Sequence, residues 1–164
     1  MSASGNDRTG RRPVLLLLSG PNLGLLGERQ PEIYGTATLA DHVDRADKAA
    51  TRSGFELKHL QSEHEADLVA AVHNARGTVE AIVVNAGALS HSSWALHDAL
   101  AAFGGVVVEL HLSNPDAREP WRRQSVVAPV ADGTVAGFGG LGYELAVEAA
   151  ARLVNGRNSG PPGA

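Results

Sequence analysis

Short apolar runs alternate with longer segments of helical period along this chain. The first run, Val14 to Ser19, is apolar up to its last residue, which is typical of a strand covered on both faces. Four further strands are predicted at 55–62, 81–85, 106–113 and 134–138, and helices at 39–52, 64–76, 91–103 and 141–154. This alternation is characteristic of a parallel α/β sheet.

Five parallel strands in a domain of this size fit a flavodoxin-like three-layer sandwich with strand order 2-1-3-4-5. The second predicted strand is more polar than the first, so we expect it near an edge of the sheet. Ligands of such folds bind beyond the carboxyl ends of the strands, near the point where the strand order reverses. Candidate residues close the strands or follow them there: Asn22, Arg29, Tyr34, Asn85 and His111.

Composition narrows the class of protein. The 164 residues are 43% hydrophobic and 20% charged, which suits one globular domain. Cysteine is absent, so disulfides, thiolate metal sites and cysteine nucleophiles are excluded. The net charge of -4, with Lys48 and Lys58 as the two lysines, offers no basic field for nucleic acid or an anionic membrane. A small-molecule ligand is therefore expected.

The ends of the chain differ in composition from its centre. Residues 1–12 and 155–164 are polar and rich in Gly, Ser and Pro, so we expect two disordered tails around one domain at 13–154. Two arginines precede the apolar run at 14–18, but a secretory signal needs an apolar stretch of roughly 7–15 residues. We therefore expect a cytoplasmic protein.

The loop from Ser19 to Gly35 carries a tyrosine and an arginine that suit base catalysis. A phenol has a pKa of about 10, so it is a poor base at neutral pH unless a cation stabilises the phenolate. Arg29 is a permanent cation five residues before Tyr34. Spacing alone favours the simpler interpretation, in which Tyr34 packs over the loop and Arg29 is solvated.

Strand alternation places Glu109 and His111 on one face, so the carboxylate is positioned to orient and charge an imidazole that acts as a general acid. The alternative is a hydrogen-bonded core histidine. Polar residues that continue past the strand, Ser113 and Asn114, favour function. The backbone N–H groups of Leu112 and Ser113 suit a carboxylate or phosphate.

Two further segments admit structural explanations. After Asn85, a glycine-containing turn leads into a helix that we expect to begin near Ser90 or His91. Ser90 suits the N-cap position of that helix. His97 and Asp98 are interpreted as surface or interface residues, and no spacing of histidines predicts a zinc site. The segment GFGGLG at 137–142 matches a dinucleotide fingerprint, but no further strand with an acidic residue follows, which favours close strand-to-helix packing instead.

Five blocks in order resemble the type II 3-dehydroquinate dehydratases: GPNLGLLGERQPEIYG, QSEHEADLVAAVHNA, NAGALSHSSWALHDAL, VVELHLSNPDARE and GFGGLGYELAVEA. The resemblance implies a flavodoxin-like subunit of a homododecamer built from trimers. It also implies the conversion of 3-dehydroquinate to 3-dehydroshikimate and water with no cofactor and no metal. The biosynthetic shikimate pathway is the expected setting, with quinate catabolism as an alternative.

The resemblance also implies roles for individual residues. Tyr34 would be the base, with Arg29 keeping it deprotonated, and His111 the acid, with Glu109 orienting it. Asn22 would hold a water molecule against the enolate oxygen. The substrate carboxylate would meet Asn85, Gly87 and the backbone of Leu112 and Ser113. Its hydroxyls would meet His91, Arg122 and a neighbouring subunit's Asp98.

Two interpretations of the fold remain open. As an enzyme, the chain would use the 19–35 loop as a lid that delivers Tyr34 to the substrate. As a binding module, it would carry FMN or a nucleotide at the same edge of the sheet. Flavin sites usually have aromatic flanks, whereas aromatic residues make up 4% of this chain.

Overall fold

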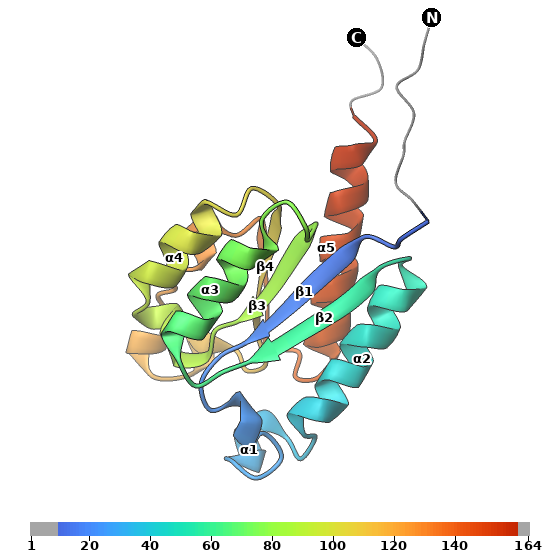
Figure 1. Ribbon diagram of the computed structural model, residues 1–164. Coiled ribbons are helices and arrows are strands. Elements are labelled where there is room, and N and C mark those ends of the chain that lie inside the picture. Colours follow the sequence, from blue (N-terminus) through green and yellow to red (C-terminus); the bar gives the residue numbers. More distant parts are fainter. Residues whose placement is uncertain (1–9, 161–164) are drawn as a thin grey trace, which may run out of the picture.

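The computed structural model describes residues 10–160, which form a three-layer α/β/α sandwich (Figure 1). Its strands are β1 (Val14–Ser19), β2 (Glu56–Gln61), β3 (Ala81–Asn85), β4 (Val106–His111) and β5 (Gly133–Ala136). All are parallel, in the order β2-β1-β3-β4-β5. The predicted flavodoxin-like topology is confirmed, with β2 at an edge.

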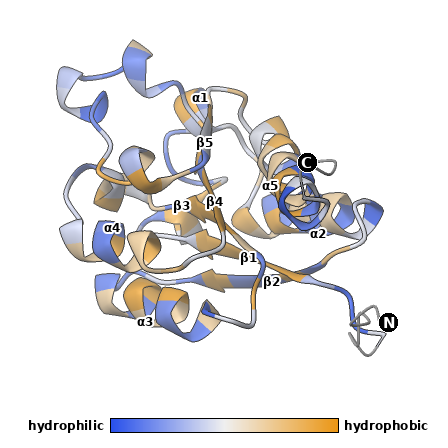
Figure 2. Ribbon diagram, turned by 90° about the horizontal axis from the view of Figure 1, so that it is seen from above, coloured by the Kyte–Doolittle hydropathy of each residue, from blue (hydrophilic) through white to orange (hydrophobic). Residues whose placement is uncertain are grey.

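The five α-helices of the described residues are α1 (Pro31–Tyr34), α2 (Leu39–Arg52), α3 (Glu65–Ala75), α4 (Trp94–Ala101) and α5 (Leu141–Asn158). Helices α2 and α5 cover one face of the sheet, and α3 and α4 cover the other (Figures 1 and 2). No helix among residues 10–160 is long and apolar enough to span a bilayer.

Alternate residues of the inner strands supply two separate cores. Leu15, Leu17 and Val83 pack toward α2 and α5, together with buried alanines of both helices. Leu16, Leu18 and Ile82 pack toward α3 and α4. Because β1 and β3 are apolar on both faces, they occupy the centre of the sheet.

The structure corrects the predicted helix boundaries at two places. Helix α4 begins at Trp94, and its N-cap is Ser93, whose Oγ accepts the N–H of Leu96 over 3.1 Å. Ser90 instead lies in a 3₁₀ turn, Gly87–His91, and donates to the Gly87 carbonyl over 2.8 Å. Helix α5 continues to Asn158, so residues 155–158 belong to the fold. The parts of the predicted tails at residues 1–9 and 161–164 lie outside the described residues.

The 137–142 glycines pack as predicted for a close strand-to-helix connection. A Cβ at Gly142 would lie 3.0 Å from Leu110 Cδ1, and one at Gly140 would lie 2.9 Å from His42 Cε1. Side chains at these positions would push α5 away from β4 and α2. The glycine pattern therefore has a structural explanation.

The 19–35 loop, predicted without regular structure, contains two short helical turns. A 3₁₀ turn spans Leu23–Leu25, and α1 follows at Pro31–Tyr34. Leu23 and Leu26 are buried in the core beneath the loop. These two anchors hold the loop over the carboxyl end of β1.

Candidate active site

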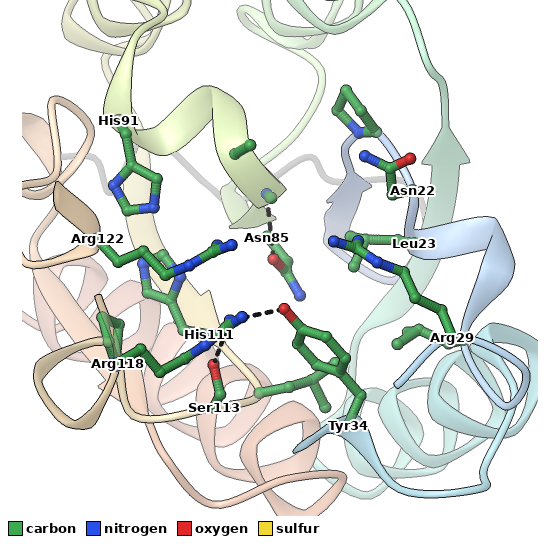
Figure 3. A pocket seen from close by; sticks show the side chains of 16 residues that line it. Asn22, Leu23, Arg29, Tyr34, Asn85, His91, His111, Ser113, Arg118 and Arg122 are labelled. Carbon is green, nitrogen blue, oxygen red and sulfur yellow. Dashed lines mark hydrogen bonds between the residues drawn. The ribbon is translucent and has the colours of Figure 1, made fainter. Parts of the chain in front are cut away.

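A cleft opens beyond the carboxyl ends of β1, β3 and β4, where the strand order reverses (Figure 3). Its empty volume is about 680 Å³, a figure that includes space open to solvent. The sequence-predicted residues that line it are Asn22, Arg29, Tyr34, Asn85, Gly87, His91, His111, Leu112, Ser113 and Arg122. Segments far apart in the sequence thus meet where the topology predicts a ligand site.

Two predicted residues do not line the cleft of this chain. Glu109 lies behind His111 and is 1% exposed. Asp98 is exposed on α4. The structure therefore brings Glu109 to the site through His111, whereas Asp98 faces solvent.

Glu109 and His111 form a buried hydrogen-bonded pair at the end of β4. His111 Nε2 lies 2.7 Å from Glu109 Oε1. Burial acts to raise the pKa of Glu109, but the hydrogen bonds from His111, Ser125 and Thr134 outweigh it and hold this pKa below its ordinary value. The carboxylate is thus available to orient the imidazole and to stabilise a positive charge on it.

Tyr34 lies between two arginines on the opposite side of the cleft (Figure 3). Arg118 Nη1 donates a 2.7 Å hydrogen bond to Tyr34 Oη, and Cζ of Arg118 is 5.3 Å from the ring centroid. Arg29 Cζ is 5.6 Å from the same centroid. Two permanent positive charges thus flank one phenol.

The side-chain amide of Asn85 is held from two directions. Its Oδ1 accepts the Gly87 N–H over 3.3 Å, and its Nδ2 donates to Tyr143 Oη over 3.4 Å. Burial raises the pKa of Tyr143 to about 12, so this hydroxyl stays protonated. One hydrogen of Nδ2 is left for a ligand in the cleft.

The outer wall of the cleft is built by the segment after β4. His91 Nδ1 lies 2.7 Å from the Gln124 carbonyl oxygen, and the His91 ring meets Trp121 edge to face. Arg122 donates from Nε to Glu119 Oε2 over 2.7 Å and lies over the Trp121 ring. These contacts place the His91 imidazole and the Arg122 guanidinium side by side at the rim (Figure 3).

On the β1 side, Asn22 adopts a left-handed backbone conformation with φ of 67°. Its N–H donates to Glu63 Oε2 over 2.8 Å, and this hydrogen bond lowers the pKa of Glu63. The contact joins the start of the 19–35 loop to the segment after β2. Asn22 is thereby fixed at the mouth of the cleft.

The sequence of residues 13–151 matches the model of the dehydroquinase class II family. The chain belongs to that family. Among relatives of this dehydroquinase-family chain, a 3-dehydroquinate dehydratase of Bacillus licheniformis is 50% identical over 135 residues, which are 82% of this chain and 93% of the relative. One from Desulforudis audaxviator is 50% identical over 141 residues, covering 86% and 94%.

Solved structures of class II dehydroquinases share the fold. The type II dehydroquinase from Propionibacterium acnes superposes with a TM-score of 0.83 at 38% identity, covering 88% of this chain and 99% of that one. The enzyme from Butyrivibrio crossotus gives a TM-score of 0.82 at 33% identity, with coverage of 88% and 98%. Five parallel strands in the order 2-1-3-4-5 are thus the architecture of this family.

Residue-by-residue sequence reasoning missed several contributors to this dehydroquinase-family site. Arg118, Tyr143, Glu63 and Ser125 were not predicted. The one available signal was that Arg118, Tyr143 and Glu63 fall inside the blocks that carry the resemblance, whereas Ser125 lies outside them. Among the described residues, no three histidine, aspartate or glutamate side chains converge as metal ligands.

Proposed function

We propose that this chain dehydrates 3-dehydroquinate to 3-dehydroshikimate through an enolate, with Tyr34 as base and His111 as acid. The observation that carries the proposal is the pairing across one cleft of a phenol between two arginines and an imidazole backed by a carboxylate. An elimination next to a ketone needs these two proton-transfer groups. The names of the relatives support the same reaction.

The base acts first. The phenolate oxygen of Tyr34 takes a proton from C2, and the electrons of the C2–H bond move into the neighbouring carbonyl to give an enolate. Arg118 and Arg29 stabilise the negative charge on Tyr34 before the transfer. Asn22, at the mouth of the cleft, holds a water molecule against the enolate oxygen.

The acid completes the reaction. The enolate electrons form the C1–C2 double bond as the C1–O bond breaks. His111 protonates the departing hydroxyl, which leaves as water, and Glu109 stabilises the imidazolium before the transfer. No redox change or outside co-reactant is needed, so the reaction requires no cofactor.

Substrate binding is assigned to the remaining cleft residues. Asn85, Gly87 and the backbone N–H groups of Leu112 and Ser113 receive the carboxylate, at the edge of the sheet. His91 and Arg122 receive ring hydroxyls at the rim. The exposed position of Asp98 suits a contact with a neighbouring subunit's substrate, in a homododecamer built from trimers.

The setting proposed for this activity is the shikimate pathway in the cytoplasm. The same chemistry would serve quinate catabolism. The 19–35 loop would act as a lid that closes over the substrate and excludes water.

Product formation tests the function. Absorbance of the conjugated enone is followed for wild type, Tyr34→Phe and His111→Ala. Wild type is expected to turn over, and each variant to lose roughly 10²–10⁴-fold in kcat with little change in substrate binding. A wild-type protein that is yellow with bound flavin and forms no enone would instead favour the FMN-binding module.

A further inference from the structure

Ser125 lies beside the buried carboxylate of Glu109, on the segment between β4 and β5. Its Oγ is 2.5 Å from Glu109 Oε1, the same oxygen that faces His111 Nε2 at 2.7 Å. Thr134 Oγ1 donates to the other oxygen, Oε2, over 3.3 Å. A carboxylate that is 1% exposed depends on such donors, because burial disfavours its charge.

The hydrogen bonds around Ser125 determine where its proton points. The backbone N–H groups of Val127 and Ala128 donate to Ser125 Oγ over 3.1 and 3.0 Å. A hydroxyl has two lone pairs and one proton to donate. Both lone pairs accept from the backbone, so the proton is directed at Glu109 Oε1. A separation of 2.5 Å is typical of a hydroxyl that donates to a carboxylate.

This arrangement decides which nitrogen of His111 holds its proton at rest. Glu109 Oε1 already accepts a hydrogen bond from Ser125, which favours the ionised carboxylate. The proton between Glu109 Oε1 and His111 Nε2 therefore resides on Nε2. A neutral imidazole carries a proton on one nitrogen only. Nδ1 has no hydrogen-bond partner among residues 10–160, and His111 lines the cleft.

We propose that Ser125 is a positioning residue for the acid. It holds Glu109 as an anion, which keeps the resting proton of His111 on Nε2 and leaves Nδ1 to carry the proton given to the substrate. The catalytic part rests on the proposed function, whereas the position of the resting proton does not. The other charged or titratable side chains that line the cleft with His111 are Arg29, Tyr34, His91, Arg118 and Arg122.

The resting proton is tested without substrate. In wild-type protein labelled with ¹⁵N-histidine, solid-state NMR in alkaline buffer distinguishes protonated from unprotonated ring nitrogens, and His111→Gln identifies the His111 signals by their loss. A protonated Nε2 and an unprotonated Nδ1 are expected. A proton on Nδ1 would overturn the proposal whether or not the chain dehydrates 3-dehydroquinate.

The role of Ser125 is tested by kinetics. Ser125→Ala is expected to lower kcat by roughly 10-fold to 10²-fold, the effect of losing one hydrogen bond to a charged group, with KM nearly unchanged. The alkaline limb of the kcat profile should move to higher pH, because a carboxylate without its donor is more basic and holds the pair's proton more tightly.

Two variants separate this role from packing. Ser125→Thr retains the hydroxyl and is expected to restore both kcat and the pH profile. Thr134→Val, the matched control, removes the longer contact, to the oxygen that does not face His111, and should lower kcat less than Ser125→Ala does. The proposal is overturned if Ser125→Ala keeps the wild-type kcat and pH profile, if threonine does not rescue it, or if it lowers kcat equally in the His111→Ala background.

Discussion

Arg118 Nη1 and Tyr34 Oη are joined by a 2.7 Å hydrogen bond between residues 84 positions apart in the sequence. The contact connects the 19–35 loop to the segment after β4, on opposite sides of the cleft (Figure 3). The same Arg118 nitrogen also donates to Ser113 Oγ over 3.3 Å. Arg118 thus fixes both the position and the electrostatic environment of the phenol that we propose as the base.

Arg118→Met is expected to lower kcat by roughly 10²-fold, the scale for loss of one preorganised hydrogen-bond donor in an active site. The variant keeps a long side chain but removes the donor and the charge beside Tyr34. Steady-state kinetics with 3-dehydroquinate provides the measurement. Arg123→Met is the matched control, because Arg123 is exposed and lies outside the cleft. Equal kcat values for the two variants would remove Arg118 from the mechanism.

Borohydride is expected to trap no adduct between this chain and 3-dehydroquinate. Trapping needs a Schiff base, and a lysine that forms one must be desolvated. Lys48 is exposed and paired with Asp44 at 2.7 Å, and Lys58 is exposed on β2. Mass spectrometry after reduction in the presence of substrate is the measurement. A substrate-sized mass increase on either lysine would contradict the enolate route.

His42 is expected to make the fold less stable in acid. It is buried against Tyr143, with ring centroids 4.8 Å apart, and neither ring nitrogen has a hydrogen-bond partner within residues 10–160. Burial lowers the pKa of His42. As the pH falls below about 6.5, the ordinary pKa of a histidine, the side chain of His42 binds a proton more readily in the unfolded chain than in the folded one, and the free energy of unfolding therefore decreases.

His42→Phe preserves the stacked ring and removes this proton uptake. Urea unfolding at neutral and mildly acidic pH should show a smaller loss of stability in acid for this variant than for wild type. His73→Gln, which changes an exposed histidine on α3, is the control and should behave as wild type does. If His42→Phe lost as much stability as wild type over the same pH range, His42 would not be the group responsible.

Strands and helices were predictable from the sequence because apolar residues recur in them with the period of the faces that are buried. The bounds of β1 and β3 are those predicted, since each strand is apolar up to its last residue, which is polar. The Glu109–His111 contact followed from strand alternation alone. Residues two positions apart in a strand lie on the same face, whatever the rest of the chain does.

Contacts from irregular segments were not predictable in this way. Arg118 and Ser125 lie between β4 and β5, where the chain forms only short 3₁₀ turns with no repeating period. Their partners are set by how that segment folds back over the sheet. The start of α4 was misplaced for a related reason: Ser90 and Ser93 are both good N-cap residues, and only the tertiary turn at Gly87–His91 decides between them.

The central claim, that Tyr34 removes the C2 proton independently of the acid, is tested most directly by isotope exchange. Each variant is incubated with 3-dehydroquinate in D₂O, and deuterium at C2 is measured by NMR above the rate without enzyme. His111→Ala should exchange the proton much faster than it forms product, because the enolate forms but the hydroxyl leaves slowly without its acid. Tyr34→Phe should show no exchange. Equal exchange by the two variants would contradict the assignment of Tyr34 as the base.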